Sequence, residues 1–314
     1  MISVYITVAI LLTVLLGFLL YIFDTAFYNP PRKRERRVDL GEQYRALGDR
    51  LNEPYRQVKN STFESVEIIS FDGTLLKGKY YHFKDGAPVD IIFHGYRSKA
   101  ENDCGGGFVL ARDFGHNVLL PDHRAHGNSK GNVITFGVKE RYDCLEWIKY
   151  ISERFNGVKI VISGVSMGAA TVLMASDLDL PENVKGIIAD CAYSSPKEII
   201  LLESKKMGFP QKIAEPFISL SAKFFARFNW TETSPEQAVK NAKVPVLIIH
   251  GEDDRFVPFY MSKPIFEACT SKKRIFTVKD AGHGLSFLID EEGYKKEVND
   301  FKRAVLSDDM SYFE

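Results

Sequence analysis

Short apolar runs separated by polar, glycine-containing segments fill most of the chain after residue 63. Two of them, residues 65–71 and 74–83, are joined through Asp72-Gly73 and predict a β-hairpin. The later runs are nearly continuous in Val, Ile, Leu and Phe, which is typical of strands buried on both faces of a parallel sheet. They lie at residues 89–95, 116–122, 158–164, 184–190, 244–251 and 273–280.

Helical patterns occupy the segments between these predicted strands. One apolar stripe at helical spacing runs through residues 145–155 and another through residues 294–305, each with polar residues on the opposite face. Strands and helices that alternate in this way form βαβ units, with helices on both faces of the sheet. We therefore predict an α/β fold with a mostly parallel central sheet.

The connection between the runs at 184–190 and 244–251 is longer than an ordinary crossover needs. Part of it predicts an amphipathic helix, which is either an ordinary covering helix or a small cap over about residues 195–235. As a cap, its apolar face would roof a ligand site at the strand ends. The apolar positions of this helix are Ile213, Phe217, Leu220, Phe224 and Phe228.

The N-terminal segment differs from the rest of the chain. Ile2–Phe23 carries no charge, and as a helix it spans about 33 Å, enough to cross a hydrocarbon core of about 30 Å. A secretory signal carries its positive charges before the apolar run, whereas here a basic cluster follows at residues 32–37. We expect a retained, single-pass membrane anchor over residues 1–23. The positive-inside rule then predicts that the chain after it is cytoplasmic.

Two further segments complete the expected organisation. Residues 24–62 are predicted to form a basic juxtamembrane linker and a helix, the latter from apolar residues at helical spacing over 40–55. Residues 63–314 are predicted to form the α/β domain, including the cap insertion. No repeat that would indicate a solenoid or a propeller is present in the sequence.

Composition narrows the possible classes of protein. A hydrophobic content of 45% with 26% charged residues is typical of a globular domain, and a net charge of zero gives no reason to expect nucleic acid as a partner. The four cysteines, Cys104, Cys144, Cys191 and Cys269, show neither disulfide-framework nor zinc-site spacing. Free, mostly buried thiols fit a reducing cytoplasm.

A serine with activating surroundings follows the predicted strand at residues 158–164. In open parallel sheets, ligands bind outside the carboxyl ends of the strands. Ser166 lies there between Gly164 and Gly168, and a run of small, helix-forming residues comes next. The pattern predicts a sharp strand-to-helix turn that presents the hydroxyl at a helix N-terminus, where the helix dipole favours developing negative charge.

A serine nucleophile needs a base within hydrogen-bond reach, and a third group must orient the base. His283 follows the last predicted strand, and Asp253 and Asp254 follow the strand at 244–251. Asp190, at the end of another strand, is an alternative orienting acid. The chain order serine, aspartate, histidine is that of the α/β-hydrolases.

Five motifs in sequence resemble the signature set of the α/β-hydrolase superfamily. More narrowly, the chain is similar to the membrane-anchored serine hydrolases of the Bem46-like group and to the serine aminopeptidase-like branch. The resemblance covers roughly residues 63–305. The motifs are FHGYRS at 93–98, DHRAHGNS at 122–129, GVSMG at 164–168, HGEDDRFVP at 250–258 and DAGHG at 280–284.

The resemblance implies a role for each matching residue. Ser166 would be the nucleophile, His283 the base and Asp254 the acid. The backbone N–H groups of Tyr96 and Met167 would form the oxyanion hole. Such a hydrolase requires neither a cofactor nor a metal.

One other pair of residues is a candidate metal site. His123 and His126 suggest two ligands, but no third ligand lies near them in the sequence. We therefore expect no zinc there.

Three functions are compatible with these motifs. The first is hydrolysis of a carboxylic ester, either a small-molecule ester or an acyl lipid. The second is peptide cleavage of the aminopeptidase type, which calls for acidic side chains over the pocket, where residues 195–230 offer only Glu198, Glu203 and Glu215 among several lysines. The third is a non-catalytic scaffold, although scaffolds of this kind usually lack a triad residue.

Overall fold

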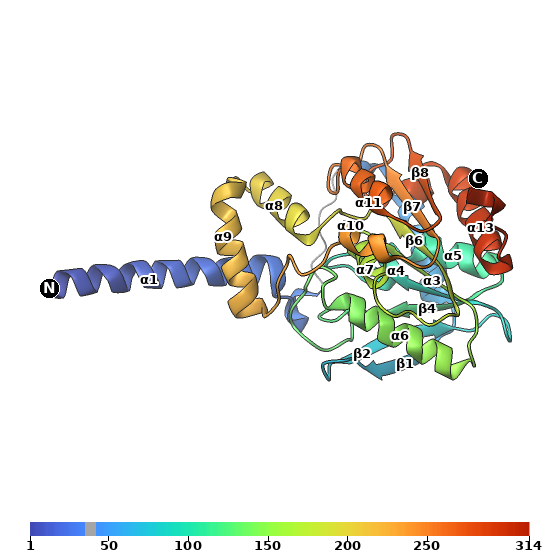
Figure 1. Cartoon of the computed structure of the whole chain (residues 1–314), viewed down its shortest axis with the longest axis horizontal. Helices are drawn as coiled ribbons and strands as arrows, with labels where there is room; N and C mark the ends of the chain where they lie inside the picture. Colours follow the sequence, from blue (N-terminus) through green and yellow to red (C-terminus); the bar gives the residue numbers. More distant parts are fainter. Residues whose placement is uncertain (35–41, 314) are drawn as a thin grey trace.

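An eight-stranded sheet forms the centre of the molecule (Figure 1). The structure is a computed structural model and describes residues 1–34 and 42–313. The strand order is β1-β2-β4-β3-β5-β6-β7-β8. β2 runs antiparallel to β1 and β4, and all other neighbours are parallel, so the mostly parallel sheet with an N-terminal hairpin is confirmed. The strands are β1 (Glu64–Ile69), β2 (Leu75–Tyr81), β3 (Val89–Phe93), β4 (Asn117–Pro121), β5 (Ile160–Val165), β6 (Val184–Asp190), β7 (Val246–Gly251) and β8 (Lys273–Val278).

Helices cover both faces of this sheet (Figure 1). Most connect successive strands, and the two longest stripes predicted from sequence fall on α6 and α13. The helices are α1 (Ile2–Ile22), α2 (Glu42–Leu47), α3 (Asp49–Asn60), α4 (Ala100–Asp103), α5 (Gly105–Asp113), α6 (Glu140–Arg154), α7 (Met167–Ala175), α8 (Pro196–Lys206), α9 (Gln211–Ser221), α10 (Pro235–Ala238), α11 (Ser262–Ala268), α12 (Ser286–Ile289) and α13 (Glu291–Ser307). Short 3₁₀ turns lie at Pro31–Lys33, Val239–Asn241, Phe259–Met261 and Met310–Phe313, and π-helical turns at Phe23–Phe27 and Ala222–Ala226.

The core lies in two layers, one on each face of the sheet. Successive strand residues point to opposite faces, so Ile160 and Ile162 of β5 pack with α6 and α7. Val161, between them, packs with Phe301 of α13 on the other face. This two-sided burial is the reason the central strands are continuously apolar rather than alternating.

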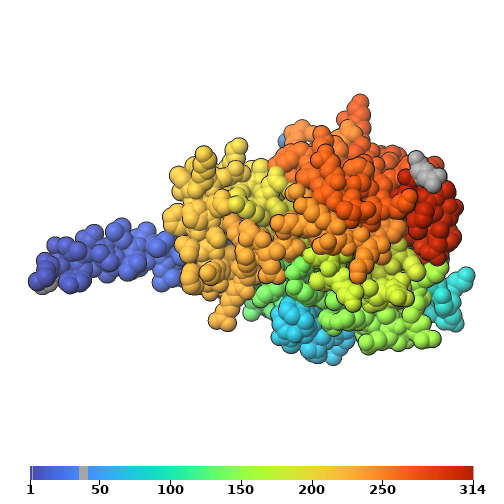
Figure 2. All heavy atoms as spheres, in the orientation of Figure 1, coloured from blue at the N-terminus to red at the C-terminus, as the bar shows by residue number. Residues whose placement is uncertain are grey.

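α1 projects from the body of the molecule (Figures 1 and 2). By length and composition, Ser3–Phe27 is the one candidate membrane span among the described residues. The described side chains before Phe18 are all exposed, whereas Leu19 and Phe27 are buried. The base of α1 is therefore anchored in the rest of the protein.

The segment after α1 is attached to the α/β domain over the length that the structure describes. The Ile134 N–H donates to the Phe27 carbonyl at 2.8 Å, and the Arg34 guanidinium donates to the carbonyls of Gly127, Ser129 and Gly131. The rest of the basic cluster, residues 35–37, and the start of the predicted juxtamembrane helix lie outside the described residues. In the described part, residues 24–34 run along the domain as a packed strap.

The cap differs in two respects from its prediction. Residues 196–228, here called the cap, form α8, α9 and a π-helical turn rather than one helix. The buried face of α9 carries Ala214, Ile218 and Ser221, while Ile213 and Phe224 are 61% and 63% exposed. Only part of the predicted apolar stripe thus points outward: Ile213, Leu220 and Phe224 are exposed, whereas Phe217 packs on Phe18 and Phe228 packs on Phe27.

Candidate active site

The turn that carries Ser166 explains why glycines flank it. β5 ends at Val165 and α7 begins at Met167, so Ser166 alone makes the turn, with φ 56° and ψ −116°. A Cβ on Gly164 would lie 2.3 Å from the backbone carbon of Gly168, and a Cβ on Gly168 would lie 2.1 Å from the Phe93 carbonyl oxygen. No side chain fits at either position. The turn therefore presents the serine hydroxyl above the sheet.

Three side chains predicted to act together form a hydrogen-bonded chain. His283 Nε2 lies 2.9 Å from Ser166 Oγ, and its Nδ1 lies 2.8 Å from Asp254 Oδ2. Because the carboxylate can only accept, Nδ1–H donates to Asp254, and Nε2 is left to accept from the serine hydroxyl. All three side chains are buried. This is the arrangement in which a histidine can remove the serine proton.

Asp254 has donors on both carboxylate oxygens. The N–H groups of Phe256 and Val257 donate to Oδ1 at 2.9 and 2.8 Å. His250 Nε2 lies 3.4 Å from Oδ2. Burial alone would raise the pKa of Asp254, but the charge and hydrogen bonds of His283, with those of His250, outweigh it and hold the pKa well below its ordinary value. Asp254 is therefore an ionised carboxylate.

Asp190, the alternative acid, does not reach the His283 ring by a hydrogen bond. Its Oδ2 accepts from the Tyr294 hydroxyl at 3.1 Å, and its Oδ1 has no hydrogen-bond partner among the described residues. Burial raises its pKa to about 6. The hydrogen bonding of the structure thus favours Asp254 over Asp190 as the partner of His283.

The loop after β3 offers one free N–H next to Ser166. The Gly95 N–H donates to Asp103 Oδ2 at 2.8 Å, and the Arg97 N–H donates to His126 Nε2 at 2.9 Å. The Tyr96 N–H between them and the Met167 N–H donate to no other residue in the described ranges. Both N–H groups thus remain available as donors, as the predicted oxyanion hole requires.

His94 lies beside His123 and His126, the candidate zinc pair. Its ring lies 4.8 Å from that of His123 and 5.0 Å from that of His126. However, both ring nitrogens of His94 and of His126 are hydrogen-bonded to backbone groups of the surrounding loops. His94 and His126 therefore have the bonding of residues that hold the loop of Tyr96 and Arg97 in place, whereas neither ring nitrogen of His123 has a hydrogen-bond partner among the described residues.

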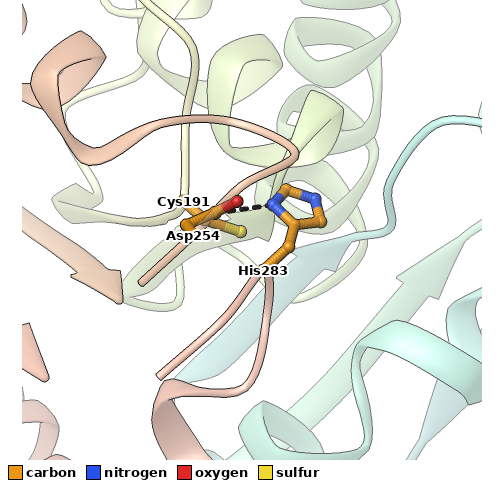
Figure 3. Close-up of side chains that lie close together, drawn as sticks. All are labelled: Cys191, Asp254 and His283. Carbon is orange, nitrogen blue, oxygen red and sulfur yellow. Dashed lines mark hydrogen bonds and ion pairs between the residues drawn. The ribbon is translucent and has the colours of Figure 1, made fainter. Parts of the chain in front are cut away.

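Cys191 lies beside the pair of Asp254 and His283 (Figure 3). One potential ligand atom from each residue lies within 4.8 Å of the others, a spacing that a metal ion could span. Burial, with the charges of Asp190 and Asp254, raises the pKa of the Cys191 thiol well above its usual value. A metal would need the thiolate, and the histidine nitrogen and carboxylate oxygen are already bonded to each other. The donor set fits a neutral thiol packed against a hydrogen-bonded pair.

Two cavities of about 270 Å³ each meet at Ser166. The first, here the apolar cavity, lies between the base of α1 and the cap, and its lining includes Phe18, Ile22, Ile199 and Ile218. The second, here the polar cavity, lies under α2 and α3. Its lining includes His283, Tyr44, Asn52, Asn102, Arg97 and Ser98. A bound substrate can therefore place parts of different polarity on the two sides of the serine.

Sequence reasoning missed the residues that come from the N-terminal segment. Phe18 and Ile22 of the predicted anchor line the apolar cavity, and Tyr44 lines the polar one. Nothing in the spacing of these residues distinguishes them from other apolar or aromatic positions. Asp103 and His250 were also missed as partners, although His250 stands in a motif with Asp254 and could have been paired with it.

Comparison with known proteins supports the fold described above. A family model described as alpha/beta hydrolase fold matches residues 91–218. The uncharacterized protein YqkD of Bacillus subtilis is 26% identical over 275 residues, which cover 86% of this chain and 88% of YqkD. Lysophosphatidylserine lipase ABHD12 of Danio rerio is 23% identical over 66% of this chain and 52% of the lipase.

Solved structures agree with the family model. The Pyrococcus furiosus esterase Pf2001 aligns with a TM-score of 0.63 at 22% identity, over 89% of this chain and 98% of the esterase. Est1E of Butyrivibrio proteoclasticus, with ferulic acid bound, aligns with a TM-score of 0.60 at 19% identity, over 79% of this chain and all of Est1E. The chain therefore has the α/β-hydrolase fold, and its sheet order, its strained serine turn and these relatives support its placement in the α/β-hydrolase superfamily.

Proposed function

We propose that the protein is a serine hydrolase that cleaves a carboxylic ester with a lipid-derived acyl chain. The observation that carries the proposal is the hydrogen-bonded chain from Ser166 through His283 to Asp254, at the meeting point of the two cavities. Relatives and structural neighbours that are named as a lipase and as esterases support ester hydrolysis as the reaction class.

The reaction starts with proton transfer inside this chain of residues. His283 Nε2 takes the Ser166 proton as the oxygen attacks the ester carbonyl, and Asp254 stabilises the imidazolium that forms. The N–H groups of Tyr96 and Met167 donate to the oxygen of the tetrahedral intermediate. His283 then protonates the leaving alcohol, and a water that it activates later releases the acid from Ser166.

The two cavities determine the orientation in which an ester substrate binds. The leaving alcohol has to lie within reach of His283, and His283 lines the polar cavity. The acyl chain then extends into the apolar cavity, whose lining is mostly aliphatic and aromatic. This orientation favours an ester of a fatty acid with a polar alcohol.

Peptide cleavage receives less support from the same residues. Of the three cap glutamates, Glu203 lines the apolar cavity, and its carboxylate is paired with Lys206. Glu215 is paired with Lys197, and Glu198 accepts from Ser194. These carboxylates are already engaged, so they offer little to a substrate ammonium group.

The same proposal includes the attachment of the protein to a membrane and the subgroup of hydrolases that it resembles. α1 would span the bilayer once, with the basic residues after it and the catalytic domain on the cytoplasmic side. The five motifs support a protein that resembles the Bem46-like and serine aminopeptidase-like hydrolases. Labelling of intact and opened vesicles by a membrane-impermeant reagent tests the orientation.

A fluorophosphonate probe tests the nucleophile. The full-length protein in detergent should be labelled, and labelling should be lost in Ser166→Ala and after heat denaturation. Ser176→Ala is the matched control, because Ser176 is also buried and lies at the other end of α7. If Ser166→Ala were labelled as strongly as the wild type, Ser166 would not be the nucleophile. An unlabelled, folded wild type would instead favour the scaffold function.

A further inference from the structure

The apolar surface of the molecule extends from α1 onto the cap. Ile213, Leu220 and Phe224 are 61%, 39% and 63% exposed, and Met207 and Phe209 are 52% and 37% exposed. These five residues, here called the cap surface, lie on α9 and on the chain just before and after it. Isolated exposed apolar residues are ordinary, but a cluster beside a projecting apolar helix indicates a contact with an apolar environment.

α9 is fixed to the base of α1 by specific contacts. The Ser221 hydroxyl donates to the Leu19 carbonyl at 2.9 Å, and both residues are buried. The Phe18 ring packs edge-on against Phe217, with centroids 5.3 Å apart. In Figure 1, α9 runs across α1 rather than along it. A bilayer that contains α1 therefore has α9 lying along its surface.

The length of α1 determines how deep α9 lies. Residues 1–17, the part free of the domain, span about 25 Å as a helix, whereas the hydrocarbon core is about 30 Å thick. The hydrocarbon core of the bilayer consequently reaches the level of Phe18 and of the neighbouring cap surface. A helix that lies in the interface with its apolar side chains inserted is a common membrane contact.

Charge on the cap agrees with this placement. Residues 196–228 contain six basic and three acidic side chains. Each of the three acidic groups has a partner within the protein, as described above. Lys205, Lys212, Lys223 and Arg227 are exposed and have no ion pair with a described residue. Basic side chains around an inserted apolar surface match the anionic headgroups of the cytoplasmic leaflet.

The apolar cavity opens on the same side. Tyr21 of α1 and Met207 and Phe209 of the cap line the cavity, and all three are also exposed. They therefore form its mouth. Two of them belong to the cap surface, so the mouth and the exposed apolar cluster are continuous.

We propose that the cap surface docks into the cytoplasmic leaflet and that the apolar cavity takes the acyl chain of a lipid ester directly from that leaflet. The base of α1 is then a wall of the substrate site as well as an anchor. The second part of this proposal rests on the ester-hydrolase function proposed above. The docking itself can be measured without any catalysis.

The docking experiment uses tryptophan fluorescence of the full chain in vesicles. Phe224→Trp places an indole in the cap surface, and Ile69→Trp places one at a site on β1 that is equally exposed, at 62%. The two native tryptophans are buried and provide the background to subtract. We expect the added emission of Phe224→Trp to be blue-shifted and to be quenched by lipids brominated near the headgroup. Ile69→Trp should show neither effect.

Equal, water-like emission from the two variants, without quenching, would overturn the docking. This result would hold whether or not the protein proves to be an esterase. Conversely, a wild type that hydrolyses no ester while Phe224→Trp is quenched would count against the proposed function and leave the docking supported.

A kinetic experiment tests delivery of the substrate. The double variant Ile213→Glu/Phe224→Glu should lower the rate on a long-chain monoacyl ester supplied in vesicles by about tenfold, because two carboxylates lift the surface out of the leaflet. Its rate on a water-soluble butyrate ester should stay near that of the wild type, since neither residue lines the apolar or the polar cavity. Ile69→Glu is the matched control for an added charge. An unchanged rate on the vesicle substrate would refute delivery through the cap surface.

Discussion

Asp190 and Asp254 occupy equivalent places at the ends of β6 and just beyond β7, yet their surroundings give them opposite properties. Both are buried, with 4% and 5% of their surface exposed. The pKa of Asp254 is held well below its ordinary value, whereas burial raises the pKa of Asp190 to about 6. Burial acts on both carboxyl groups, so the difference must come from their partners.

The partners differ in number and in charge. Asp254 accepts two backbone N–H groups and lies against the rings of His250 and His283. Asp190 accepts one hydroxyl, from Tyr294, and leaves an oxygen without a partner among the described residues. Donors to the charged form outweigh burial at one site and do not at the other. A carboxylate at a strand end thus becomes an orienting acid only where the fold supplies its donors.

The largest expected effect is the loss of activity in Asp254→Asn. An amide there cannot hold His283 in the tautomer that accepts the serine proton, so kcat should fall by about 10⁴-fold on any ester. The rate on a soluble butyrate ester measures it. Asp253→Asn is the matched control, because among the described residues its partly exposed carboxylate bonds Gln43 and Arg255 and no other, and it should stay within about threefold of the wild type.

Asp190→Asn should change the rate on the soluble butyrate ester by less than about threefold relative to the wild type, because the hydrogen bonds of His283 run to Asp254 and Ser166. The asparagine can still accept from Tyr294. A loss as large as that of Asp254→Asn would make Asp190 the acid and reverse the assignment of the two carboxylates.

Stability should depend on pH in opposite directions at the two sites. The raised pKa of Asp190 means that the folded state holds the proton more tightly than the unfolded state. Its contribution to stability is therefore complete below about pH 4 and is lost as pH rises through about 6. Asp190→Asn should be more stable than the wild type at pH 8, by up to about 3 kcal/mol, and no more stable at pH 4.

Denaturant unfolding of the two proteins between pH 4 and pH 8 measures this difference. Asp254 supplies the contrast, since its lowered pKa adds stability above about pH 4 that is lost as pH falls. A pH-independent gap between Asp190→Asn and the wild type would show that Asp190 keeps an ordinary pKa.

The smallest expected effect is that of Tyr294→Phe. The change removes the hydroxyl donor of Asp190 and should cost about 1 kcal/mol at pH 8, where the carboxylate is charged. At pH 4 the loss should be smaller. Ester hydrolysis should not change, and a rate as low as that of Asp254→Asn would mean that Tyr294 contributes to the site in a way its hydrogen bond does not reveal.

Local patterns were sufficient to predict much of the fold. The apolar runs located all eight strands, because strands buried on both faces leave continuous signals of their own. The glycines on either side of Ser166 likewise indicated, from the sequence, a close contact between β5 and α7. The three residues proposed as the triad stand in short motifs behind separate strands, and the parallel sheet brings such ends together.

Packing between distant segments was not predictable in the same way. The helical spacing of Ile213 and Phe224 predicts that these residues face inward, but α9 buries Ala214 and Ile218 instead. Which face turns inward depends on α1, some two hundred residues earlier in the chain. For the same reason, the apolar pattern of Phe18 and Ile22 indicates a membrane span and gives no sign that they line a cavity.

The hydrogen bond between Leu19 and Ser221 also has a consequence for biosynthesis. Its two residues are 202 positions apart, so at about 5–20 residues per second a ribosome needs about 10–40 s to pass from one to the other. During that interval α1 exists without the helix that will cover its base. Until then the bilayer can surround the apolar side chains of α1. The substrate site is complete only after the second half of the chain has been synthesised and has folded.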